Sequence, residues 1–105
     1  KDIRDIQLPP LRKDYSHIYL QYPIQYKARW DLVKFLMREG RDVSIQHMGN
    51  CAKYEIFSDF SKSCSNAEKV SSSVILLPTY PGYPKKEIVK NIKTIRKFFG
   101  KSIDF

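Results

Sequence analysis

The sequence is poor in cysteine and histidine. Its only cysteines are Cys51 and Cys64, too few for a disulfide scaffold, and without a secretion signal we expect two reduced thiols, with a single bridge as the alternative. With His17 and His47 as the only histidines, no pair has zinc-ligand spacing, so we expect no metal. His47 and Cys51, four residues apart, could form a Cys/His nucleophile, but a small buried cysteine and a hydrogen-bonded histidine are the more ordinary interpretation. We therefore assign no catalytic residue.

Long apolar runs are also lacking. The longest uninterrupted aliphatic run is Val74 to Leu77, whereas a membrane span needs about 20 residues. No basic-then-apolar leader opens the sequence, so we expect a cytoplasmic protein with no membrane partner. The first residue is Lys1 rather than Met. We expect either a processed chain or a piece of a longer one.

Acidic residues are outnumbered, with 11 Asp and Glu against 19 Lys and Arg, which gives a net charge of +8. Apolar residues make up 42% of the chain, close to the globular average, which argues against general disorder. The 105 residues suffice for one domain with one modest core. A catalytic domain together with a cofactor domain would not fit.

The pattern of the first half predicts a strand, a helix and a second strand. Residues 1–16 contain a Pro-Pro pair and are expected to be an extended lead-in or linker. Apolar residues alternate over 17–26, which predicts a strand, with Pro23 at an edge or a bulge. Leu32, Val33, Leu36 and Met37 have helical spacing within 28–39, and Gly40 ends that helix. Residues 42–48 are expected to form the second strand.

The second half predicts helical turns, two helices and a buried strand. Aromatic residues recur every third position over 54–60, which indicates short helical turns. We expect a helix over 64–72, a strand over 74–77 and a helix over 84–99, whose apolar residues are Ile88, Ile92, Ile95 and Phe99. The predicted fold class is α+β, a small sheet of about three strands with helices packed on one face. Residues 17–105 would form the domain.

Lysines gather on the outer face of the last helix, where Lys86, Lys90, Lys93 and Lys97 lie outside the apolar stripe. A small basic nucleic-acid-binding module would use such a face. Exposed lysines also keep small domains soluble, and no RNA-recognition, KH, zinc-finger or helix-turn-helix motif accompanies them. We favour a solvated face and expect no nucleic-acid partner, and a stand-alone interaction domain is the other alternative.

A series of short motifs runs along most of the chain, over residues 17–99. They are Tyr22-Pro23-Ile24, Arg29 and Leu32 at a helix start, Leu36 with Arg38-Glu39-Gly40, Cys64-Ser65-Asn66-Ala67-Glu68, Leu76-Leu77-Pro78-Thr79-Tyr80-Pro81-Gly82, and Glu87-Ile88 with Ile92. In this order and spacing they resemble the C-terminal part of the DegT/DnrJ/StrS family of sugar aminotransferases. The resemblance implies the small domain of a fold-type-I transferase that depends on pyridoxal phosphate and acts on nucleotide-linked keto sugars.

The resemblance also implies what this chain lacks. In the family, the lysine that bonds pyridoxal phosphate and the Asp that pairs with its pyridine nitrogen belong to an N-terminal large domain. We therefore expect pyridoxal phosphate in the full-length enzyme and no cofactor in this chain alone. The expected partners are the missing large domain, a nucleotide-sugar substrate and, at full length, a second copy in a homodimer. The chain alone should be inactive.

One segment of the family's small domain approaches the substrate, and here it spans residues 46–51. Cys51 lies where many members carry a His, whereas His47 is displaced by about one turn. Side-chain amides and imidazole suit hydroxyl recognition, so the resemblance points to Gln46, His47 and Asn50 as sugar-facing residues that line part of the substrate cleft. The alternative is that Asn50 and its neighbour Gly49 only make a turn.

Overall fold

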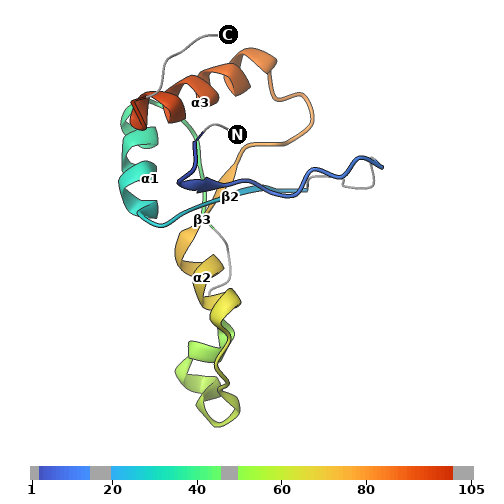
Figure 1. The fold of residues 1–105 in the computed structure, drawn as a ribbon, viewed down its shortest axis with the longest axis vertical. Coiled ribbons are helices and arrows are strands. Elements are labelled where there is room, and N and C mark those ends of the chain that lie inside the picture. Colours follow the sequence, from blue (N-terminus) through green and yellow to red (C-terminus); the bar gives the residue numbers. More distant parts are fainter. Residues whose placement is uncertain (1–2, 15–19, 46–49, 101–105) are drawn as a thin grey trace.

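The computed structural model describes residues 3–14, 20–45 and 50–100. Figure 1 shows the order of the elements along the chain. These are β1 (Ile6–Gln7), β2 (Tyr22–Tyr26), α1 (Arg29–Arg38), the 3-10 turns η1 (Cys51–Lys53) and η2 (Glu55–Phe60), α2 (Ser65–Ser73), β3 (Val74–Leu77) and α3 (Lys85–Phe98).

The three strands form one antiparallel sheet in the order β1-β2-β3. In its register, Ile24 lies opposite Ile75 and Tyr22 lies opposite Leu77. Because side chains alternate along a strand, these four residues point to the same face. Ile6 extends that face to β1, where it lies opposite Tyr26.

Helices α1 and α3 cover this face and bury the core. Leu32, Val33 and Leu36 of α1 and Ile95 of α3 are buried and cluster with Ile24 and Ile75. At the edge of the core, Tyr26 meets Phe98 and Phe99 edge-on, with ring centroids 5.9 and 5.1 Å apart. The fold class that the sequence predicts is confirmed.

Two details of the sequence prediction are wrong. The segment 42–48 forms no strand within its described residues, only a bridge between Ser44 and Leu76. The turns η1 and η2, which follow in the chain, extend away from the sheet rather than along β3 (Figure 1). The third strand is instead β1, which lies within the predicted lead-in. Met37 is 65% exposed because α1 buries only one side.

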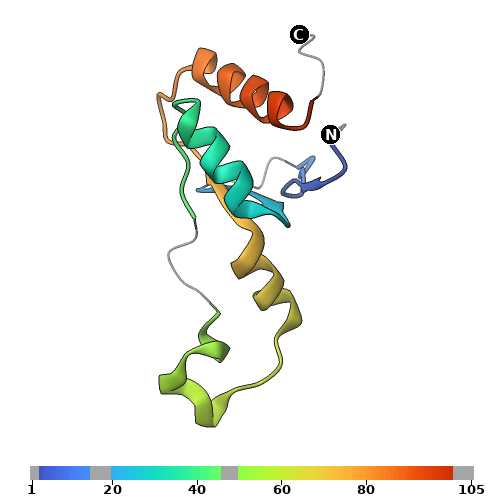
Figure 2. The ribbon, with the colours of Figure 1, turned by 90° about the vertical axis from the view of Figure 1, so that its left-hand side faces the viewer.

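A long arm, defined as residues 50–73, extends from the sheet (Figures 1 and 2). Every residue from 53 to 69 is exposed, including Ile56 at 82% and Phe60 at 80%. The radius of gyration is 15.7 Å, against about 13 Å for a compact domain of this length. The arm therefore has no core of its own.

The position of the core predicts that the same substitution changes stability differently at two isoleucines. Ile75 is fully buried and Ile56 is 82% exposed. Ile75→Val should lower the free energy of unfolding by about 0.5–1.5 kcal/mol, because it removes a buried methylene. Ile56→Val should change it by less than about 0.5 kcal/mol. Urea unfolding followed by circular dichroism measures both, and equal effects would contradict this assignment of the core.

Candidate functional site

Of the three predicted sugar-facing residues, Gln46 and His47 lie outside the described residues, and Asn50 is the first residue of the arm. Asn50 precedes η1, and its side-chain Oδ1 accepts a hydrogen bond from the backbone N–H of Ala52 at 3.1 Å. The Ser61 hydroxyl donates to the carbonyl of Ala52 at 2.9 Å, and this hydrogen bond links the end of η2 to η1. Asn50 thus begins a helical turn, as the alternative interpretation expects.

That role uses only one end of the Asn50 amide. Its Nδ2 is buried and has no hydrogen-bond partner among the residues that the structure describes. A buried donor without a partner costs free energy, of the order of 1–3 kcal/mol. The described residues therefore leave one end of the Asn50 amide unsatisfied.

Arg29, part of the helix-start motif, fixes the arm to the body. Its guanidinium donates to the carbonyls of Ser71 and Val74 at 2.7 and 3.5 Å, where α2 ends and β3 begins. A cation at a helix C-terminus also meets the negative end of the helix dipole. The guanidinium lies 5.0 Å from the ring centre of Trp30. Arg29 is thus committed to structure.

A second polar network joins the end of α1 to α3. Arg41, just after Gly40, pairs with Glu87 at 2.8 Å and donates to the side chain of Asn91 at 3.3 Å. Asn91 donates in turn to the Tyr83 hydroxyl at 3.1 Å. The hydrogen bond from Arg41 is the main reason that the pKa of Glu87 lies below its ordinary value, and Lys90 at 3.4 Å adds to it.

Sequence reasoning missed this network, although one signal was present. Asn91 lies three residues after Ile88 and four before Ile95, on the apolar stripe of α3. A polar residue on such a stripe must find partners when it is buried, and Asn91 is only 5% exposed.

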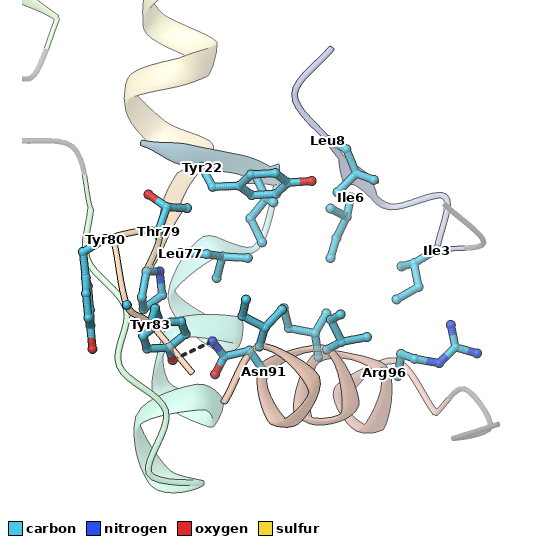
Figure 3. A pocket seen from close by; sticks show the side chains of 16 residues that line it. Ile3, Ile6, Leu8, Tyr22, Leu77, Thr79, Tyr80, Tyr83, Asn91 and Arg96 are labelled. Atoms are coloured by element: carbon cyan, nitrogen blue, oxygen red, sulfur yellow. Dashed lines mark hydrogen bonds between the residues drawn. The ribbon is translucent and has the colours of Figure 1, made fainter. Parts of the chain in front are cut away.

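An apolar groove of about 630 Å³ lies between α3 and the sheet (Figure 3). Its sheet side comprises Ile3, Ile6, Leu8, Tyr22 and Leu77. Its helix side comprises Ile88, Ile92 and Ile95, and the connection 78–83 closes one end. Asn50, the predicted sugar-facing residue that lies within the described ranges, does not line it.

The lysines test whether this chain could bond pyridoxal phosphate. Every lysine in the described ranges is exposed. A lysine that forms an imine at neutral pH must be desolvated or placed beside another cation, so exposed lysines do not suit this role. The lysines in the described ranges therefore do not fit the role of the residue that bonds pyridoxal phosphate. The described residues also contain no group of three or more His, Cys, Asp or Glu placed to hold a metal ion.

Part of the basic face of α3 is already paired. Lys90 lies 3.4 Å from Glu87, and Lys97 lies 3.2 Å from Glu39 at the end of α1. Both lysine side chains are 58% exposed, so these pairs contribute little stability. They do neutralise some of the charge that a nucleic-acid interface would need. No helix in the described ranges is long and apolar enough to cross a bilayer.

Comparison with known proteins points to sugar aminotransferases. No protein-family model matches the chain. It is 28% identical over 94 residues to a UDP-N-acetyl-3-dehydro-α-D-glucosamine 3-aminotransferase of Acidithiobacillus ferrooxidans, a match that covers 89% of this chain and 26% of the relative. The chain therefore spans about a quarter of the length of this relative.

Two solved structures also match this chain over about a quarter of their own length. A DegT DnrJ EryC1 StrS aminotransferase from Brucella abortus superposes with a TM-score of 0.80 at 24% identity, over 92% of this chain and 27% of that one. The S. venezuelae protein DesV, solved with a ketimine intermediate, gives 0.81 at 17% identity, over 93% and 27%. The resemblance to a C-terminal part of these aminotransferases, predicted from the sequence, is confirmed, and so is the fold.

The Arg41–Glu87 pair predicts a pH dependence of stability. Because the folded-state pKa of Glu87 is lowered, its contribution is present above the unfolded value of about 4.3 and is lost as the pH falls through the folded pKa. Glu87→Gln should therefore destabilise the chain at neutral pH, and this effect should shrink as the pH falls and Glu87 becomes protonated. Urea unfolding across this range measures it, with Glu55→Gln on the exposed arm as control. A Glu87→Gln effect that persists in acid would exclude this cause.

Proposed function

We propose that this chain is the C-terminal small domain of a pyridoxal-phosphate-dependent aminotransferase that acts on nucleotide-linked keto sugars. The observation that supports this most directly is the proportion of the matches. They cover 89–93% of this chain but only 26–27% of each aminotransferase. In this proposal the N-terminal large domain supplies the lysine and the binding site for pyridoxal phosphate, and residues 1–16 connect that domain to residues 17–105, with Ile6–Gln7 adding an edge strand.

The small domain would form one wall of the substrate cleft through the segment that leads into η1. Asn50 supports this role, since its buried Nδ2 lacks a partner among the described residues while its Oδ1 holds the turn. Gln46 and His47, which precede it in the chain, are proposed as further hydrogen-bonding residues toward the sugar. This is binding and orientation of the sugar, and the chain transfers no amino group by itself.

The exposed arm supports assembly into a larger enzyme. Short isolated helices are marginal in water, so a segment without a core needs tertiary contacts for its stability. Ile56 and Phe60 are at least 80% exposed, and covering them would remove apolar surface from water. We propose that the large domain and, in a cytoplasmic homodimer, the second subunit provide that cover.

The exposure of every lysine in the described ranges predicts that the isolated chain does not bond pyridoxal phosphate. The isolated chain, incubated with pyridoxal phosphate and reduced with borohydride, should show no stoichiometric label at any single lysine by mass spectrometry, because exposed lysines are not activated. It should also show no transamination with an amino donor. Stoichiometric labelling of one lysine together with turnover would contradict the proposal.

Asn50 can be tested in the complete enzyme with variants that separate its two roles. Asn50→Asp keeps the oxygen that caps η1 and removes the Nδ2 donor. We expect the KM for the sugar substrate to rise about tenfold, the usual effect of losing one hydrogen bond of about 1.4 kcal/mol. The melting temperature should be unchanged.

Asn50→Ser is the neutral control, because serine also caps helices and adds no charge. It should reproduce the rise in KM if the lost amide donor, rather than the new charge of Asp, is the cause. An unchanged KM in both variants would reduce Asn50 to its capping role.

A further inference from the structure

The groove between α3 and the sheet is an incomplete layer of the fold. The pair Ile24 and Ile75 is covered by both helices and is at most 1% exposed. The next pair on the same face, Tyr22 and Leu77, is only half-buried and lines the groove instead (Figure 3). This end of the face is therefore left open by α1 and α3, and a further apolar element packed on it would complete the layer.

The lining of the groove suits apolar side chains rather than a polar small molecule. Ile88, Ile92 and Leu8 line it and are 44%, 41% and 39% exposed. Its buried polar residue, Asn91, already has partners at both ends of its amide, Tyr83 and Arg41. The other polar side chains of the lining are Thr79, Arg96 and three tyrosines, and the rest of the lining is apolar. A mostly apolar groove of this kind suits apolar side chains.

We propose that this groove is filled by an amphipathic helix of the same polypeptide, located N-terminal to Lys1. The inference rests on the proposed function, because it places part of the missing large domain, or its connection, in the groove. Ile3, Ile6 and Leu8 form the sheet side of the groove (Figure 3), so a chain that enters the domain passes along it. A short connection also gives such a helix a high effective concentration at the groove.

Charge argues against a second copy of this chain as the occupant. The chain carries +8, and α3 presents Lys85, Lys86, Lys90 and Lys93 to solvent. Two copies that met along α3 would bring these like charges together, which opposes association. A helix with apolar residues at i, i+3, i+4 and i+7 and acidic residues on its flanks fits both the lining and the charge.

Cysteine labelling can measure whether the groove is covered. The 105-residue chain is compared with the same chain extended by the about 25 residues encoded before Lys1, enough for an average helix and its connection. In a Cys51→Ser, Cys64→Ser background, Ile92→Cys reports on the groove, Ile88→Cys repeats the measurement, and Ile56→Cys on the arm is the control. Both groove variants should react at least about tenfold more slowly in the extended chain, because labelling then requires local opening. The arm variant should react equally in both.

Each other outcome overturns the proposal. Equal labelling in both chains would mean that the preceding segment does not fill the groove. Protection that appears in the 105-residue chain and grows with its concentration would identify a second copy as the occupant. Transamination by the complete enzyme tests the proposed function separately. If the groove cysteines react equally in both chains while the complete enzyme is active, only the groove helix is refuted. If the groove cysteines are protected in the extended chain while the complete enzyme is inactive, only the proposed function is refuted.

Discussion

The contact between Ile24 and Ile75 holds the rest of the structure together. The two side chains face each other across β2 and β3, and both α1 and α3 pack against them. The aromatic contacts of Tyr26 with the end of α3 and the Arg41–Glu87 pair both lie around this small core. Eight hydrophobic residues are buried in the part of the chain that the structure describes, and a core of this size gives little surplus stability to anything that projects from it.

This limited core explains why so much apolar surface remains outside. The arm and the groove lie on different sides of the core, yet both expose large apolar side chains, such as Phe60 and Ile92. A small monomer rarely maintains two such surfaces unless something covers them. The aminotransferase matches suggest what that cover is. About three quarters of the length of each relative lies outside the part that this chain matches. At the start of the arm, Asn50 caps η1 through its Oδ1, whereas its Nδ2 has no partner among the described residues.

Sequence periodicity predicted the elements that bury a whole face and missed those that depend on distant partners. The spacing of Leu32, Val33 and Leu36 located α1, because helix burial repeats every third or fourth residue. Strand β1 has only two residues, too few for any periodicity, and it exists because β2 offers a free edge. The groove could not be predicted either, since Ile88 and Ile92 have the spacing of a buried stripe whether or not a partner covers them. At the site, the tendency of Asn50 to begin a turn was readable, but its unpaired Nδ2 was not.

The central claim is that this chain is one part of a larger aminotransferase polypeptide. The most direct measurement is the mass of the native protein that contains this sequence, isolated with an antibody against the arm and mapped by peptide mass spectrometry. The account predicts a polypeptide about four times as long, consistent with the 26–27% coverage of its relatives, with the additional residues on the N-terminal side. A native protein whose mass corresponds to these 105 residues alone would contradict it.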